Sequence, residues 1–352
     1  MPCRPQNSWA GSDFPIKWAF TPHIGHLVAA EIIHGYFSSR TANSNMGAMS
    51  ECIPTPAAVV IYRPDHSQLS ALLSGIGIER RIFAFLNGPP DEGTERILAQ
   101  FTNLRQIRSP QNIGLGAGLN AVMSTAREEG FTTLVLFDQD SVPTRELIDQ
   151  LAEHWRDLTA AGHQLAALGP RLGIPSGQGY KTIRYAWRGK TLAPEVAAVD
   201  FLPTSGSLVS IEAWAAIGPF RTDYFIGSID VEWGFRAWSK GYPSVCLLDV
   251  EMAHRWGTPV KEQRHGWRPQ IVRQTDLRTF YYVRNSVDLL QQSYIPCRWR
   301  LESAIRLIGQ LSLLLIWRKL NWRTFNTVGR ALWAGATGRL GPASNITGAD
   351  SF

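Results

Sequence analysis

Short apolar runs alternate with helical segments along the first half of the chain, and this alternation limits the possible folds more than any other feature. The runs are four to six residues long and are followed by turn-forming residues, as buried strands are. Strands are expected at 57–62, 81–86, 104–108 and 134–137, and helices at 66–75, 92–100, 119–129 and 145–161. This order predicts an α/β fold with a mostly parallel sheet and helices on both faces. Ligands of such sheets bind beyond the carboxyl ends of the strands.

The composition excludes several other classes of protein. The chain has 352 residues, 44% of them apolar, which is enough for one large domain or two smaller ones. Its four cysteines are scattered without CxxC spacing, which argues against a structural zinc site and is typical of a reducing compartment. No run reaches the roughly 18 apolar residues of a membrane span, and the N-terminus lacks a secretory pattern. We therefore expect a cytoplasmic protein.

Asp138 and Asp140 directly follow the strand expected at 134–137. Two like charges this close repel each other, so a positive partner is expected between them. Mg²⁺ and Mn²⁺ prefer carboxylate oxygens, together with phosphate oxygens and water. The pair therefore predicts a site for a divalent cation, Mg²⁺ or Mn²⁺, that leaves positions for a diphosphate. The alternative is a solvated loop, in which the same pattern is common.

Three glycines lie between Asn112 and Asn120, before the helix expected at 119–129. Glycine lets the backbone approach a ligand closely, and the helix N-terminus that follows favours anions. Leu119 occupies the position of the last glycine in the dinucleotide fingerprint, so the segment does not match that motif. The alternative is an ordinary glycine-rich turn between a strand and a helix.

Asp230 and Glu232 lie at the start of a helix expected at 232–240. The helix dipole alone would favour an acidic residue there, whereas the functional interpretation is a general base that deprotonates a hydroxyl group. His254 follows a strand expected at 244–249. A single histidine is usually structural, and it becomes a candidate metal ligand if the fold brings it to Asp138 and Asp140.

Seven short motifs, in order between Ala57 and Pro342, together resemble glycosyltransferase family 2, and within it the bacterial rhamnosyltransferases. The Asp-Gln-Asp-Ser and Asp-Val-Glu-Trp forms point to this subgroup. The motifs are Tyr62-Arg-Pro-Asp65, the segment 112–120, Asp138-Gln-Asp-Ser141, Thr204-Ser-Gly-Ser207, Asp230-Val-Glu-Trp233, His254-Arg-Trp-Gly257 and Tyr281-Tyr-Val-Arg-Asn285.

The resemblance implies a GT-A fold and an inverting transfer of L-rhamnose from dTDP-L-rhamnose to a polysaccharide or lipid-linked glycan acceptor. Asp138 and Asp140 would hold the metal on the diphosphate, with His254 as a third ligand. Asp230 aligns with the catalytic base of the family, and Glu232 would bind or orient the acceptor. The residues implied in binding the nucleotide sugar are Pro64, Asn87, Asn112, Gly118, Asp138, Ser205 and Gly206.

Two positions depart from the family pattern. The second strand of relatives usually ends in Asp-Asn, whose Asp contacts the base, but this chain has Leu86-Asn87, which leaves the base specificity open. Gly227 stands where related sequences often carry an Asp. Two rival interpretations remain: a transferase for another sugar, such as galactofuranose, and a non-catalytic protein that binds sugar nucleotides.

The expected domains are a poorly ordered extension (1–55), a catalytic domain (56–270), a helical region (271–342) and a tail (343–352).

From Lys261 to Leu340 there are 14 Lys or Arg and 4 Asp or Glu, against 21 and 25 in the rest of the chain. Between Leu301 and Leu320 apolar residues recur on one helical face with Arg and Trp at its edges. This pattern is typical of a helix on an anionic membrane, here the cytoplasmic face of the inner membrane. The alternative is a helix packed on the catalytic domain; nucleic acid is not expected as a partner, because no binding module is visible.

Overall fold

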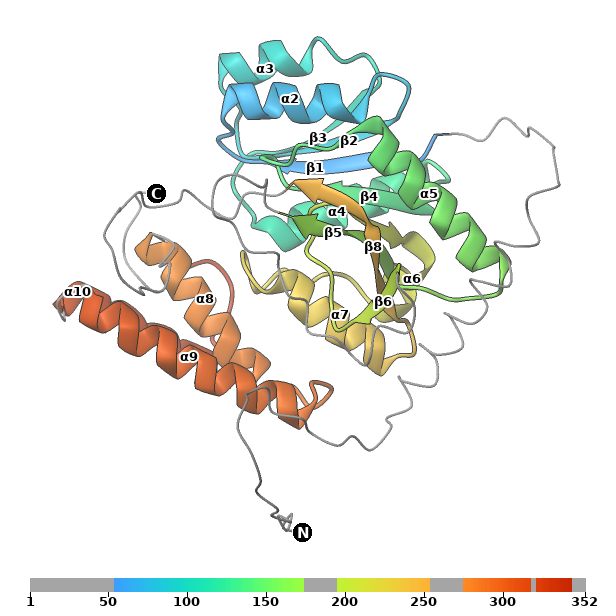
Figure 1. Cartoon of the computed structure of the whole chain (residues 1–352). Helices are drawn as coiled ribbons and strands as arrows, with labels where there is room; N and C mark the ends of the chain where they lie inside the picture. Colours follow the sequence, from blue (N-terminus) through green and yellow to red (C-terminus); the bar gives the residue numbers. More distant parts are fainter. Residues whose placement is uncertain (1–53, 174–194, 254–274, 318–320, 344–352) are drawn as a thin grey trace, which may run out of the picture.

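The computed structural model describes residues 54–173, 195–253, 275–317 and 321–343 (Figure 1). The predicted N-terminal extension lies almost entirely outside these ranges, and so do residues 344–352 of the tail. His254 and most of the Gly- and Pro-rich loop before β6 are also outside them.

Eight strands form one sheet in the order β3-β2-β1-β4-β7-β5-β8-β6. Strands β7 and β6 run antiparallel to their neighbours, and the other six share one direction, as the sequence predicts. The strands are β1 (Ala57–Ile61), β2 (Ile82–Asn87), β3 (Leu104–Ser109), β4 (Thr133–Phe137), β5 (Ala167–Gly173), β6 (Val196–Val199), β7 (Ser207–Ser210) and β8 (Ser244–Ala253). The carboxyl ends of β1, β2 and β4 therefore lie side by side at one edge of the sheet.

Helices cover both faces of the sheet, and each face has its own hydrophobic core (Figure 1). Alternate residues of β1 divide between the two cores: Val59 packs with α2, α3 and α5, whereas Val60 packs with α4, α6 and α7. These helices are α2 (His66–Ile76), α3 (Glu92–Leu98), α4 (Leu115–Glu128), α5 (Arg145–Ala160), α6 (Ile211–Ile217) and α7 (Ile229–Ser239).

Side-chain caps fix where several helices begin. The Asp65 carboxylate accepts the backbone N–H of Ser67 at 2.9 Å, and the Asp91 carboxylate accepts that of Thr94 at 2.7 Å. Such caps satisfy N–H groups that have no partner within the helix, and each contributes about 1 kcal/mol. Because both caps follow directly on the exits of β1 and β2, they also set the length of the connections at the carboxyl edge.

Three boundaries differ from the sequence prediction. Helix α4 begins at Leu115 rather than at 119, so two of the three glycines lie inside its first turns. Residues 201–209, whose apolar pattern predicts a strand, form one only at 207–210 (β7), and β6 lies before them at 196–199. The helix expected at 232–240 begins earlier, at Ile229, and residues 223–228 form a loop before it.

The C-terminal region is helical, as expected from residue 275 onward, with α8 (Asp276–Leu289), α9 (Cys297–Trp317) and α10 (Trp322–Ala336). Helices α8 and α10 pack against each other, and a Cβ at Gly335 would lie 2.5 Å from the Arg284 carbonyl oxygen, so glycine permits this close approach. Phe280, Val283, Ala331 and Ala334 are buried in a third core between these helices. Within the described ranges, no helix combines the length and the apolar character needed to cross a membrane.

Candidate active site

Two carboxylates leave the sheet at the end of β4, as the sequence predicts. Asp138 is half-buried and Asp140 is exposed, and a turn closed by Ser141 N–H to the Asp138 carbonyl (3.0 Å) holds them beyond the strand. Burial, together with the negative charges of Asp140 and Asp230, raises the pKa of Asp138 to about 7. The positive charge of Arg278, at the start of α8, opposes this shift. Residues from β4, α7 and α8 therefore share one electrostatic site.

Gln139, between the two aspartates, orients the turn. Its side-chain oxygen accepts the backbone N–H of Tyr62 at 2.8 Å, and its side-chain nitrogen donates to the Tyr62 carbonyl oxygen at 3.2 Å. The amide thereby acts as a short extension of the sheet from β4 to the end of β1. Only a side chain with one donor and one acceptor can make both bonds, which explains an amide at this position.

Asp230 lies in the first turn of α7 and is half-buried. Burial raises the pKa of its carboxyl group, while hydrogen bonds from the backbone N–H groups of Val231 (2.9 Å) and Thr204 act in the opposite direction. A raised pKa favours uptake of a proton near neutral pH, which suits a general base.

The segment Thr204-Ser-Gly-Ser207 connects the two acidic positions. The Ser205 and Ser141 hydroxyl groups are 2.5 Å apart, which ties the segment to the turn after β4. Gly206 has φ +81°, and a Cβ there would lie 2.9 Å from the Met252 methyl carbon. Because Thr204 also contacts Asp230, Ser205 and Gly206 lie between the paired aspartates and the candidate base.

A hollow lies between the ends of β1 and β2, and Pro64, Leu86 and Pro89 are among the residues that line it. Pro64 therefore lies at a hollow beyond the carboxyl ends of β1 and β2, and its role in binding a nucleotide stays a prediction. Leu86, the departure from the family pattern, gives the hollow an apolar wall.

Asn87 and Asn112 hold the glycine segment in place. The Asn87 side-chain oxygen accepts the backbone N–H of Ile113 at 2.8 Å, and that of Asn112 accepts the N–H of Gly114 at 2.9 Å. Asn87 is 4% exposed, so its observed role is to fasten the segment to the end of β2.

Two residues of the predicted site make packing or ion-pair contacts in the structure, and their predicted roles stay predictions. Gly118 faces the sheet, where a Cβ would lie 2.9 Å from Val60 and Phe85, so this glycine permits the close packing of α4. Glu232 is 1% exposed. It accepts hydrogen bonds from Arg236 (2.8 and 3.0 Å) and from the Tyr294 hydroxyl (2.6 Å), and so joins α7 to the segment between α8 and α9.

Sequence reasoning missed the residues that shape the approach to Asp230. The loop 223–228 precedes α7, and Phe225, Gly227 and Ser228 in it have positive φ. Asn285 of α8 is fully buried, and its side-chain nitrogen donates to three carbonyl oxygens of this loop, those of Tyr224 (3.1 Å), Ile226 (3.0 Å) and Gly227 (2.9 Å). The motif at 281–285 marks the residue, but nothing in the sequence indicates its partners.

Further contacts fix the same loop from two sides. The Arg284 guanidinium, also fully buried, donates to the carbonyl oxygens of Asp223 (3.0 Å) and Tyr224 (2.9 Å). The Leu115 N–H at the start of α4 donates to the Phe225 carbonyl oxygen at 2.6 Å. The loop therefore connects α8, the glycine segment and the helix that carries Asp230.

The carboxylates at the end of β4 fit a divalent cation. Their oxygens are the donors that Mg²⁺ and Mn²⁺ prefer. Such an ion would also balance the negative charges that, together with burial, raise the pKa of Asp138. The described residues contain no group of three His, Cys, Asp or Glu side chains placed to hold a metal. His254, the third ligand that the resemblance implies, lies outside the described residues.

Comparison with known proteins shows a similarity to glycosyltransferases. Residues 75–188 match the family model described as glycosyl transferase family 2. A dTDP-rhamnosyl transferase RfbF of Shigella flexneri is 23% identical over 270 residues, which cover 75% of this chain and 88% of that protein. An N-acetylglucosaminyl-diphospho-decaprenol L-rhamnosyltransferase of Mycobacterium tuberculosis is 23% identical over 240 residues, covering 58% and 76%.

The fold is similar to a solved structure of S. aureus TarS, residues 1–349, in complex with UDP-GlcNAc. The TM-score is 0.51 at 12% sequence identity, and the match covers 79% of this chain and 80% of that one. This likeness concerns the arrangement of the sheet and its helices. The chain is therefore a glycosyltransferase with the GT-A fold, and its residues 75–188 are similar to family 2.

Proposed function

We propose that the protein transfers L-rhamnose from dTDP-L-rhamnose, with inversion, to a polysaccharide or lipid-linked glycan acceptor of the cell envelope. The observation that carries the proposal is the placement of Asp230 in the same electrostatic site as the carboxylates after β4. The donor sugar is supported by the names of the two rhamnosyltransferase relatives, whose similarity extends over most of their own length.

The reaction needs two separate acidic positions. As the glycosidic bond breaks, negative charge develops on the diphosphate, and a divalent cation bound at Asp138 and Asp140 would stabilise that charge. The positive charge of Arg278 acts on the same position from α8. Asp230 would accept the proton of the acceptor hydroxyl, and its raised pKa suits that role.

The donor is tested by a thermal-shift screen of the full chain. The panel contains dTDP-L-rhamnose, UDP-galactofuranose and UDP-GlcNAc, each with and without Mn²⁺. A donor at 100 times its dissociation constant stabilises the protein by about 2.7 kcal/mol. We expect the largest rise in Tm with dTDP-L-rhamnose and Mn²⁺ together. A larger rise with UDP-galactofuranose would replace the proposed donor with that sugar, and no rise with any of the three would reject sugar-nucleotide binding.

Asp140→Asn is expected to weaken donor binding only when Mn²⁺ is present. The substitution removes one anionic oxygen from the cation site, so donor affinity measured by calorimetry should fall at least about tenfold with Mn²⁺. Without the metal, the variant and the wild type should bind alike. Asp149→Asn is the control, because Asp149 is 67% exposed on α5 and pairs with Arg80. Equal affinity of the wild type and Asp140→Asn in Mn²⁺ would remove Asp140 from the cation site.

A further inference from the structure

Helix α9 exposes a stripe of large aliphatic side chains. Leu301, Ile305, Ile308 and Ile316 are 63%, 63%, 65% and 69% exposed and are spaced so that they lie along one side of the helix. The opposite side is anchored to the protein, because Leu307 is buried in the core that α8 shares with α10. A row of this kind on a helix that is already packed on its other side indicates a surface that contacts a partner.

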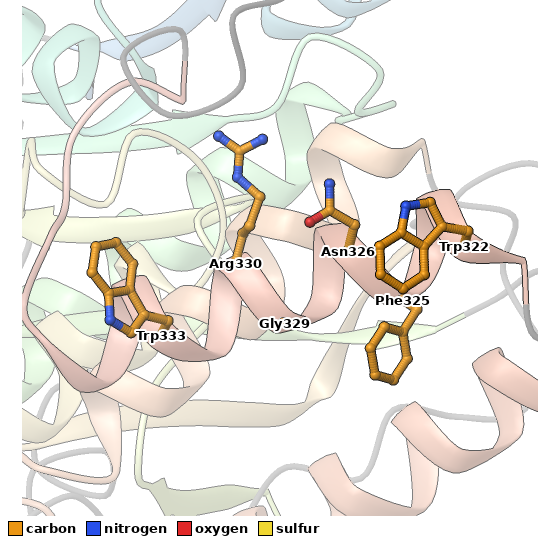
Figure 2. A pocket seen from close by; sticks show the side chains of 6 residues that line it. All are labelled: Trp322, Phe325, Asn326, Gly329, Arg330 and Trp333. Carbon is orange, nitrogen blue, oxygen red and sulfur yellow. The ribbon is translucent and has the colours of Figure 1, made fainter.

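Helix α10 continues this character with aromatic residues. Trp322, Phe325 and Trp333 are 73%, 56% and 50% exposed, and the rings of Trp322 and Phe325 stack with centroids 5.9 Å apart. Figure 2 shows these side chains on the helix together with Arg330, around a shallow hollow. The inner side of α10 is buried at Val328 and Ala331. We call the exposed apolar residues of α9 and α10 together the apolar surface.

The apolar surface is surrounded by positive charge. The described residues of 297–343 include six arginines and one acidic residue, Glu302, which pairs with Arg298 at 2.7 Å. The arginines are Arg298, Arg300, Arg306, Arg323, Arg330 and Arg339. The Arg339 guanidinium lies 4.2 Å from the centroid of the Trp333 ring, an arrangement of arginine beside tryptophan that suits the headgroup region of a bilayer.

We propose that the apolar surface docks the protein on an anionic lipid bilayer, without crossing it. Two copies of the chain meeting through this surface would bring two sets of excess arginines together, which disfavours a dimer as the occupant. Exposed leucine and isoleucine find no counterpart on nucleic acid. An anionic bilayer offers both an apolar layer for these side chains and negative headgroups for the arginines.

The location of the apolar surface agrees with transfer to a lipid-linked acceptor, so the inference rests on the proposed function. Helix α8 separates the surface from the active site: the charge of Arg278 acts on Asp138, and Phe280 packs in the core beneath α9 and α10. In a chain docked through α9 and α10, α8 would therefore lie between the membrane and the active site. The active site would be within reach of an acceptor attached to a lipid.

The test is co-sedimentation of the full chain with vesicles of phosphatidylcholine alone or mixed with phosphatidylglycerol. We expect binding to the mixed vesicles that weakens with salt, and little binding to phosphatidylcholine. The double variant Ile305→Glu/Ile308→Glu should lower the partition coefficient about tenfold or more, because it removes two apolar contacts and adds two negative charges. Ile78→Glu is the matched control, since Ile78 is 71% exposed just beyond α2, away from the apolar surface.

Binding of dTDP-L-rhamnose, measured on the same samples, separates this inference from the proposed function. A variant that keeps donor binding and loses vesicle binding supports the docking surface. Equal sedimentation of the double variant and the wild type would overturn it. A wild-type dimer that the double variant dissociates, without any vesicle binding, would overturn it in favour of a second copy of the chain.

Discussion

Asp230→Asn is expected to lower the transfer rate by about 10²–10⁴-fold while leaving donor affinity unchanged. The amide has nearly the same shape as the carboxylate, and its oxygen can still accept the N–H groups of Val231 and Thr204. It cannot take up the proton of an acceptor hydroxyl at neutral pH. The change therefore removes the chemistry of the base and preserves the local structure.

The measurement is a comparison of turnover and of donor dissociation constant for Asp230→Asn and for the control Asp149→Asn. Asp230→Asn should lose turnover alone, whereas Asp140→Asn should lose donor affinity in Mn²⁺. These two carboxylates share one electrostatic site, and the two variants separate their roles. Turnover of Asp230→Asn at the wild-type rate would assign the base to another residue, and a matching loss in Asp149→Asn would point to a general effect on folding.

The strands that build the carboxyl edge were predictable because each is a continuous apolar run. A strand of a parallel sheet is buried on both faces, so β1, β2 and β4 contain hardly any polar residues before their ends. The residues that follow them are turn formers or helix caps, such as Asp65. Sequence reasoning was weaker beyond β5, where β6 and β7 have four residues each and run antiparallel to their neighbours.

The two acidic pairs of the site show what spacing can and cannot predict. Asp138 and Asp140 lie in a turn beyond a strand, where residues two apart can point to the same side. Asp230 and Glu232 lie in the first turn of a helix, where residues two apart point in different directions. Once Asp230 faces the site, Glu232 must face elsewhere, and it is buried against Arg236 and Tyr294.

The position of Asp230 relative to Asp138 was not predictable in the same way, because it depends on contacts between distant segments. The loop 223–228 is held by Asn285 and Arg284, some 60 residues later in the chain. Arg278 enters the site from the same helix. The residue types of α8 indicate a helix, but the carbonyl groups that they contact can be seen only in the folded structure.

Asn285→Ala is expected to reduce both the stability of the protein and the turnover of the folded fraction. The substitution removes the donor that three loop carbonyl groups share. That of Tyr224 keeps its bond from Arg284, and a buried group that loses its partner costs about 1–3 kcal/mol. Phe225 and Ser228 have φ of 63° and 60°, a conformation that persists only when the surroundings enforce it. Without Asn285 the loop should relax, and α7 with Asp230 should shift relative to Asp138.

Because a displacement of about 1 Å at a reacting group can cost 10²-fold in rate, we expect kcat to fall at least about tenfold, with donor affinity preserved. Asn103→Ala is the matched control. Asn103 also donates to two backbone carbonyl groups, those of Gly77 (3.2 Å) and Arg80 (2.5 Å), but it lies at the opposite end of the sheet, before β3. The control should lower Tm without lowering kcat below its melting range.

If Asn285→Ala does not fold, Asn285→Ser keeps one donor and should show the same pattern with a smaller loss of Tm. The decisive quantity is kcat measured well below Tm, because a residue that only stabilises the fold would leave it unchanged. A fall in Tm with wild-type kcat would reduce Asn285 to a structural residue. A fall in kcat that Asn103→Ala does not share would establish that α8, which supports the helices of the apolar surface, also positions the catalytic base.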